Sequence, residues 1–354
     1  MSCNFPIEAY KVLNEFTESG KAVIYFKRSS VGKNPFEKVN IPCGRCEGCM
    51  ITRSRDWAVR CVHEASLYQD NNSFITLTYN DKSLPPQNRN CDKHYINDEG
   101  ETIYACPVYG RNLKPCIKGS LCKKDFQDFM KRLRKECHGV IPVYDESQDK
   151  VTYPIRYYHC GEYGAKLGRP HHHACLFNYV FPDMELFKER DNVKLYTSAL
   201  LHKLWPHGWC TIGKVTFETA AYVARYVMKK KYGNNASEHY VKCDEETGEL
   251  DYVEPEYTTM SRRPGIAKRW LEENVGDVYP KDFITHQGNK LKVPSYYDKI
   301  YDEMDKQELL RLKERRRKHA LRNPKDNTPQ RRKVRNDCLK ARTKRLIRGY
   351  ENEA

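Results

Sequence analysis

Apolar residues recur every three or four positions in several stretches of the chain, a period typical of amphipathic helices. In the first of these stretches Ser54 precedes the periodic residues and is a candidate N-terminal cap. In the second stretch the face opposite the apolar residues is basic. The pattern predicts helices over residues 55–69, from Phe126 to Cys137, over 195–205 and 219–231, and around Trp270 and Leu271.

Runs rich in β-branched and aromatic residues predict strands. The two longest runs, 153–162 and 172–180, are joined by residues 164–170. This link is too short for a parallel crossover, so we expect the two strands to pair antiparallel. Shorter runs predict strands over residues 22–27, 73–79 and 210–216.

Segments without a sustained period separate these elements. Residues 80–122 are predicted to form a long insertion, with a small hairpin around 97–100. A second hairpin is predicted over 282–294, with its turn at Gly288-Asn289. Because helices and strands interleave and the main strands pair antiparallel, the predicted fold class is α+β, an antiparallel β-sheet flanked by helices, over about residues 50–235.

The composition is that of a folded chain. Hydrophobic residues make up 39% of the 354 residues and aromatic residues 12%, enough to bury at least one core. No apolar run reaches membrane-spanning length, and the first ten residues do not resemble a signal peptide, so we expect no membrane association and no secretion. The sequence has no phosphate loop of the G-x-x-x-x-G-K-[ST] type, so we expect no ATP hydrolysis by the chain itself.

The net charge of +15 points to a polyanionic partner such as nucleic acid. Most of this charge lies in residues 311–348, which hold 17 Lys/Arg and 3 Asp/Glu, an excess of +14. We expect a basic tail over 301–354, helical or disordered, that follows phosphate groups. The alternative is a charged tail that only keeps the protein in solution.

Fifteen cysteines in a chain without an export signal are expected to be thiols or metal ligands rather than disulfides. Two successive C-x-x-C steps, formed by Cys43, Cys46 and Cys49, predict a structural zinc site ahead of an iron–sulfur cluster. Cys61 or His63 is the candidate fourth ligand. The alternative is that these are ordinary loop cysteines. A second set with irregular spacing carries less weight: Cys91, Cys106, Cys116 and Cys122.

Three consecutive histidines open the predicted strand at 172–180. Side chains alternate along a strand, so His171 and His173 share one face and His172 points to the other. Two imidazoles at this spacing can bind a divalent cation, and the antiparallel pair would bring Glu162 beside them as a carboxylate ligand for Mg²⁺ or Mn²⁺. The alternative places Glu162 in a solvent-exposed turn.

The predicted helix at 219–231 carries the candidate nucleophile. Tyr222, Tyr226 and Lys229 lie on one face of it. A phenol has a pKa near 10, and a nearby ammonium group stabilises the phenolate that would attack a phosphodiester. Aromatic residues at this spacing more often serve packing, but a packing face would exclude the lysine.

Three segments in this order resemble the motifs of rolling-circle replication initiators of the HUH endonuclease superfamily: 74–79 (FITLTY), 168–173 (GRPHHH) and 222–229 (YVARYVMK). Three others more narrowly resemble the replication initiation proteins of gokushovirus-type microviruses, which are small single-stranded DNA phages: 43–49 (CGRCEGC), 161–164 (GEYG) and 261–266 (SRRPGI). The resemblance covers about residues 40–300.

The resemblance implies a metal-dependent endonuclease and strand transferase that cuts single-stranded DNA at a phage origin, leaving a 5′-phosphotyrosine and a 3′-hydroxyl primer. The family's metal ligands match Glu162, His171 and His173, and its paired tyrosines match Tyr222 and Tyr226. The middle histidine stands where the family has a bulky apolar residue, which leaves the register open by one position. The nine-residue interval from Glu162 to His171 favours the ligands named.

The same resemblance predicts the partners and the domains. A host helicase and a host DNA polymerase would act with the protein in the bacterial cytoplasm. The expected domains are an N-terminal segment with the cysteines (1–50), an HUH-type nicking domain (51–300) and the basic tail (301–354). Candidate contacts to nucleic acid are Arg225, Lys230, Arg262 and Arg263.

Two other functions compete with the nickase. Two histidines and one carboxylate also form the ligand set of non-haem iron oxygenases, a hypothesis that leaves the tyrosine helix and the basic tail without roles. A non-catalytic, zinc-stabilised nucleic-acid-binding protein would explain the cysteines and the charge, but not the tyrosine helix. We expect the nickase.

Overall fold

The computed structural model describes residues 3–18, 20–85, 94–96, 102–104, 119–136, 140–145, 149–164, 168–190, 193–225, 240–243, 250–322 and 324–344. The chain forms two compact units. The terminal unit consists of Met1–Arg53 and Tyr301–Ile347, and the central unit consists of Ser54–Ile300 and Arg348–Ala354. The domain boundaries expected from the sequence stay a prediction.

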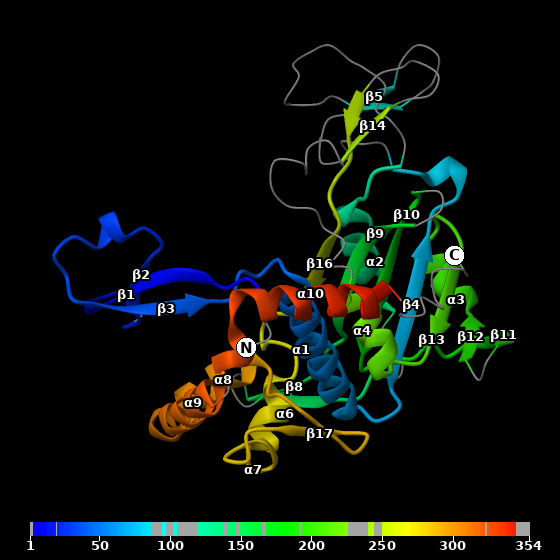
Figure 1. The fold of residues 1–354 in the computed structure, drawn as a ribbon. Coiled ribbons are helices and arrows are strands. Elements are labelled where there is room, and N and C mark those ends of the chain that lie inside the picture. Colours follow the sequence, from blue (N-terminus) through cyan, green and yellow to red (C-terminus); the bar gives the residue numbers. More distant parts are fainter. Residues whose placement is uncertain are drawn as a thin grey trace. The chain divides into compact units, whose positions relative to one another are not determined.

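The central unit is built on an antiparallel sheet of seven strands, in the order β11-β12-β13-β4-β10-β9-β16 (Figure 1). This sheet and the helices on it confirm the predicted α+β class. Its strands are β4 (Asn72–Thr78), β9 (Arg156–Tyr163), β10 (Pro170–Phe177), β11 (Glu185–Arg190), β12 (Val193–Thr197), β13 (Cys210–Gly213) and β16 (Tyr257–Met260).

The strand with the three histidines, β10, lies in the interior of this sheet. It pairs antiparallel with β9 on one side and β4 on the other, as the short link predicted for β9. The register places His171 opposite Glu162 in β9 and opposite Thr78 in β4. Every residue of β10 is buried, as expected for a strand covered on both faces.

Helices cover both faces of the sheet. On one face, α2 (Lys123–Lys135) and α3 (Ala199–Leu204) enclose the main hydrophobic core, which includes Leu77, Phe129 and Trp205. On the other face, α1 (Glu47–Ser66) stacks Trp57 on Tyr158 of β9, with ring centroids 4.6 Å apart. The helix α4 (Phe217–Arg225) covers the same face, and its Ala221 carbonyl accepts a hydrogen bond from the Ser54 hydroxyl at 3.3 Å.

Smaller elements complete the central unit. The predicted hairpin around 97–100 is confirmed by the pairing of β5 (His94–Ile96) with β6 (Thr102–Tyr104). The predicted hairpin within 282–294 is also confirmed, with its turn at Gln287-Gly288. The other elements are η2 (Asp81–Ser83), β7 (Val143–Asp145), β8 (Lys150–Thr152), β14 (Val241–Cys243), β15 (Leu250–Tyr252), α6 (Lys268–Glu273), α7 (Val275–Val278), β17 (Ile284–His286), β18 (Asn289–Leu291) and α8 (Ser295–Met304).

The terminal unit combines a small sheet with two basic helices. Its sheet has the order β2-β1-β3, and both strand pairs are antiparallel. Its elements are β1 (Ile7–Phe16), β2 (Ala22–Tyr25), η1 (Arg28–Val31), β3 (Phe36–Ile41), α9 (Lys306–Leu321), η4 (Pro324–Asn327) and α10 (Pro329–Lys344). The basic tail is therefore helical where the structure describes it. None of the described helices is long and apolar enough to cross a membrane.

Two sequence predictions of helix boundaries were wrong. The first helix begins at Glu47 rather than after Ser54, because Ser54 is an interior residue whose hydroxyl bonds α4. The helix expected from residue 195 begins at Ala199, because the preceding residues pair as β12. The Ser198 hydroxyl accepts a hydrogen bond from the Leu201 amide and caps α3 at that point.

Candidate functional site

His171, His173 and Glu162 converge on one face of the sheet. Oε1 of Glu162 lies 2.9 Å from Nε2 of His171 and 3.0 Å from Nε2 of His173. All three residues are buried, and the three ligand atoms lie within 4.8 Å of one another. The alternation along β10 and the antiparallel register with β9 therefore produce the juxtaposition predicted from the sequence.

The other nitrogen of each imidazole is held by the protein. Nδ1 of His171 lies 3.2 Å from the carbonyl oxygen of Arg169, and Nδ1 of His173 lies 2.9 Å from the Thr76 hydroxyl. A carbonyl only accepts, so Nδ1 of His171 carries the proton and Nε2 of the neutral ring presents its lone pair to Glu162. Metal-binding histidines are oriented by such contacts.

The Glu162 carboxylate needs positive charge in this buried position. Burial alone would raise its pKa, but the hydrogen bonds and charge of His171 and His173 outweigh burial and lower that pKa to about 2. Neutral imidazoles with their lone pairs directed at a carboxylate oxygen would repel it. Either protonated imidazoles or a cation between the three groups removes this repulsion.

The donor set fits a divalent cation. Adjacent ligands of an octahedral Mg²⁺, at bonds of about 2.0–2.1 Å, lie about 2.9–3.0 Å apart. The Oε1–Nε2 distances of 2.9 and 3.0 Å match that spacing. One carboxylate and two imidazoles would leave further coordination positions for water or for a ligand oxygen.

His172 lies on the opposite face of β10, in a buried chain of hydrogen bonds. The Tyr79 hydroxyl donates to the Asp125 carboxylate at 2.8 Å, so it accepts from Nε2 of His172 at 2.9 Å. Nδ1 of His172 then accepts from Nε2 of His159 at 3.1 Å, and Nδ1 of His159 accepts from the Thr259 hydroxyl at 2.8 Å. Burial, and then the neighbouring histidines, lower the pKa of His172 to about 3.

This chain closes the question of register that the sequence left open. Both ring nitrogens of His172 have protein partners on the α2 side of the sheet, away from Glu162. His172 therefore fills the core position that the family occupies with an apolar residue. His171 and His173 are the pair that meets the carboxylate.

Tyr222 packs against this cluster from α4. The helix begins with a reciprocal cap, in which the Thr216 hydroxyl accepts from the Thr219 amide and the Thr219 hydroxyl accepts from the Thr216 amide. The ring of Tyr222 is buried and meets the ring of His173 edge to face, with centroids 5.0 Å apart and an interplanar angle of 86°. It also meets Phe74 of β4 at 6.4 Å.

The other predicted site residues lie elsewhere or outside the described part. Arg225 is half-buried, and its guanidinium donates to the Ala221 carbonyl of the same helix at 3.4 Å. Arg262 and Arg263 are exposed in the turns before α6. Residues outside the described part of the chain are Tyr226, Lys229 and Lys230.

The cysteine prediction was correct for three residues and wrong for the fourth. Cys43, Cys46 and Cys49 cluster with Cys3, which the sequence reasoning did not consider. Cys61 is buried in the interior of α1, and Nδ1 of His63 contacts the Tyr297 hydroxyl at 2.8 Å. The pairing of β1 with β3, which sets Ile7 opposite Ile41, was the signal that would have placed Cys3 beside Cys43.

In the second cysteine set, Cys122 is the buried residue before α2. The rest of the set lies outside the described residues: Cys91, Cys106 and Cys116.

Comparisons with known proteins agree with the motifs. The family model of the replication-associated protein ORF2 and gene 2 protein matches residues 111–231, which contain the histidines, Glu162 and both tyrosines. Across 309 residues the chain is 31% identical to the replication-associated protein ORF2 of Spiroplasma virus 4, covering 83% of this chain and 78% of that protein. Across 303 residues it is 28% identical to the replication-associated protein VP4 of Bdellovibrio phage phiMH2K, covering 85% and 77%.

A shorter match, 29% identical over 226 residues, relates the chain to the replication-associated protein ORF4 of Chlamydia phage 1. It covers 61% of this chain and 45% of that protein. No solved structure matches the chain significantly. On the identity and coverage of the Spiroplasma virus protein, the chain belongs to the family of microvirus replication-associated proteins, the replication initiators of these phages.

Proposed function

We propose that the chain is a site-specific endonuclease and strand transferase that initiates rolling-circle replication by cutting single-stranded DNA at the phage origin. The observation that carries the proposal is the contact of Tyr222 with His173, whose Nε2 shares one carboxylate oxygen with His171. A nucleophilic hydroxyl and a cation-binding cluster on one sheet face suit phosphoryl transfer. Membership of the replication-associated family supports this function over an oxygenase or a non-catalytic DNA-binding protein.

The reaction follows from the chemistry of a phenol and a phosphodiester. The Tyr222 hydroxyl loses its proton, and its oxygen attacks the phosphorus. The bond from phosphorus to the 3′ oxygen breaks, and that oxygen takes up a proton, giving a 5′-phosphotyrosine and a free 3′-hydroxyl. A divalent cation, Mg²⁺ or Mn²⁺, held by Glu162, His171 and His173 would make the phosphorus more electrophilic and neutralise developing charge.

Tyr226 and Lys229 complete the proposal from the sequence. Four positions beyond Tyr222, Tyr226 would form a second phosphotyrosine, so that one tyrosine holds a DNA end while the other cuts again. Lys229 would stabilise the phenolate. The free 3′-hydroxyl would prime a host DNA polymerase, and unwinding would fall to a host helicase in the cytoplasm of the bacterial cell, because the chain has no phosphate loop.

The proposal is tested by trapping the covalent product. Purified protein is incubated with single-stranded oligonucleotides tiled across the genome that encodes it, with Mn²⁺ or Mg²⁺. We expect one oligonucleotide to give a protein–DNA adduct that survives denaturant, and mass spectrometry to place the phosphate on a tyrosine. No adduct on any oligonucleotide with any divalent metal would refute the endonuclease.

The basic helices α9 and α10 are predicted to retain the protein on DNA. Replacing four of their exposed cations, Lys318, Lys333, Lys340 and Arg342, with Gln should weaken binding and reduce the salt slope of the binding constant. The expected reduction is about 0.7 for each phosphate group that the variant no longer neutralises. Cleavage at saturating DNA should be unchanged.

Binding is measured by fluorescence anisotropy across a salt series, and cleavage by gel. The control replaces the three lysines with Arg and Arg342 with Lys, which keeps the charge and should keep the slope. If the well-folded Gln variant lost cleavage at saturating DNA, the tail would belong to the active site.

A further inference from the structure

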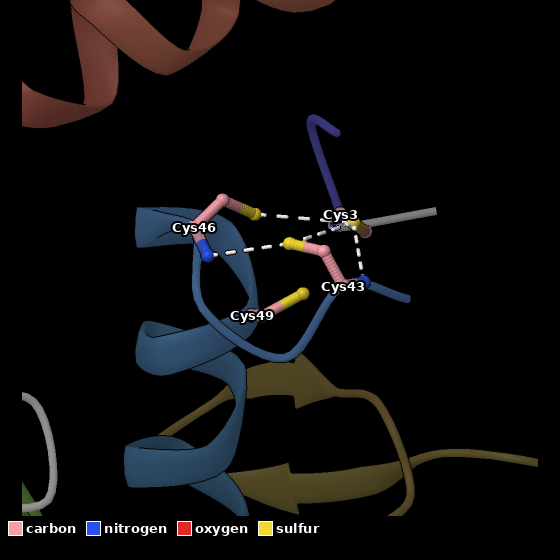
Figure 2. A group of neighbouring side chains, drawn as sticks. All are labelled: Cys3, Cys43, Cys46 and Cys49. Atoms are coloured by element: carbon pink, nitrogen blue, oxygen red, sulfur yellow. Dashed lines mark hydrogen bonds between the residues drawn. The ribbon is translucent and has the colours of Figure 1, made fainter. Parts of the chain in front are cut away.

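Four cysteine sulfurs point toward one another in the terminal unit (Figure 2). Cys3 precedes β1, Cys43 follows β3, Cys46 stands directly before α1, and Cys49 lies in its first turn. Sγ of Cys3 lies 3.6 Å from Sγ of Cys43 and 3.9 Å from Sγ of Cys46. All four sulfurs lie within 4.8 Å of one another, and all four residues are free cysteines.

These distances are those of ligands around one tetrahedral ion. Four sulfurs at about 2.3 Å from Zn²⁺ lie about 3.8 Å apart. The spacings of 3.6 and 3.9 Å fall on either side of that value. They are far too long for disulfide bonds, in which the sulfurs are about 2.0 Å apart.

The backbone around the cluster is arranged to stabilise thiolates. Three amides donate to the sulfurs: Asn4 to Cys46 at 3.4 Å, Cys43 to Cys3 at 3.2 Å and Cys46 to Cys43 at 3.3 Å. Gly44 permits the tight turn between the first two C-x-x-C cysteines, because its φ of 74° lies in the left-handed region. Hydrogen bonds to a charged sulfur favour its deprotonated form, which is the form that binds metals.

The terminal unit also lacks the core that would otherwise hold it together. Among its described residues, the buried apolar side chains are few: Cys3, Ala9, Val12, Val31, Tyr301, Leu309 and Leu312. Small units with so little buried surface commonly depend on a metal or disulfides. Next to the cluster, the Asn4 side-chain amide donates to Asn336 of α10 at 3.3 Å, so fixing Cys3 also fixes a contact to the C-terminal helix.

We propose that Cys3, Cys43, Cys46 and Cys49 bind one structural Zn²⁺ as a closed tetrathiolate site. The ion fastens the residue before β1 to the loop after β3 and to the start of α1. The site has no open coordination position, so it is structural rather than catalytic. It shares no residue with the cluster of Glu162, His171 and His173, and it holds whether or not the proposed DNA cleavage is correct.

The test measures metal content in the full-length chain, purified without a histidine tag and without chelator. Elemental analysis should find about one zinc per chain in the wild type and almost none in Cys3→Ser and Cys49→Ser. Cys338→Ser is the matched control, because Cys338 is an exposed cysteine of α10 in the same unit. It should keep the zinc, and so should the double variant His171→Ala with His173→Ala.

A second measurement does not depend on the folding of variants. Zinc X-ray absorption of the wild-type protein should show four sulfur neighbours at about 2.3 Å. Nitrogen or oxygen in place of any sulfur, iron in place of zinc, or disulfides between these cysteines would overturn the site. Full zinc retention in Cys3→Ser would overturn the fourth ligand.

Discussion

Replacing Tyr222 and Tyr226 together with Phe is expected to reduce formation of the covalent protein–DNA adduct at least about 10³-fold. The substitution removes the hydroxyls and keeps the rings, so the edge-to-face contact of residue 222 with His173 should persist. DNA binding should change little, because the proposed role of the hydroxyls is in bond formation. Adduct is measured on denaturing gels with labelled oligonucleotide, and binding by anisotropy.

The two single variants separate the roles of the tyrosines. If both act, each single variant should keep part of the adduct, and mass spectrometry should find the phosphate on the remaining tyrosine. Tyr158→Phe is the matched control, since it removes a buried hydroxyl from the same sheet face, at the far end of β9 from Glu162. Adduct at the wild-type level in the double variant would show that the nucleophile is another residue.

Replacing Glu162 with Gln is expected to lower the rate of DNA cleavage about 10³-fold, with a smaller effect on DNA binding. The change removes the one negative charge that the cluster offers to a cation, and the new amide can donate to the imidazole lone pairs. His173→Ala should act in the same direction, because it removes a ligand directly. Rates are measured across a Mn²⁺ series, and the concentration for half-maximal rate should rise.

The control for this prediction is Glu218→Gln. Glu218 is an exposed carboxylate in the first turn of α4, so its loss should leave the rate within about twofold of the wild type. A thermal unfolding scan of each variant without metal separates loss of fold from loss of cation binding. Wild-type rates and metal dependence in Glu162→Gln would place the catalytic cation elsewhere.

The part of the site that the sequence predicted rests on short-range geometry. Alternation along one strand fixes that His171 and His173 share a face, and a hairpin with a short link fixes which residue of β9 meets them. These two rules operate within a single hairpin. Glu162 could therefore be named as the carboxylate without a structure.

What the sequence did not provide depends on residues far apart in the chain. Cys3 meets Cys43 only because β1 and β3 pair across the intervening β2, and β1 and β3 were themselves missed. Helical spacing in residues 195–198 was mistaken for a helix, because the edge-strand pairing that wins there involves β11 and β13. Tertiary pairing of this kind overrides local propensity.

The hydrogen-bonded chain on the other face of β10 has a direction, and a single acid sets it. A carboxylate can only accept, so Asp125 dictates the orientation of every donor from Tyr79 through His172 to His159. Without that acid, the two imidazoles would have two equally consistent tautomeric arrangements. An aspartate in the first turn of α2 thus carries the information that distinguishes the middle histidine from its two identical neighbours, and it does so from outside the strand that bears them.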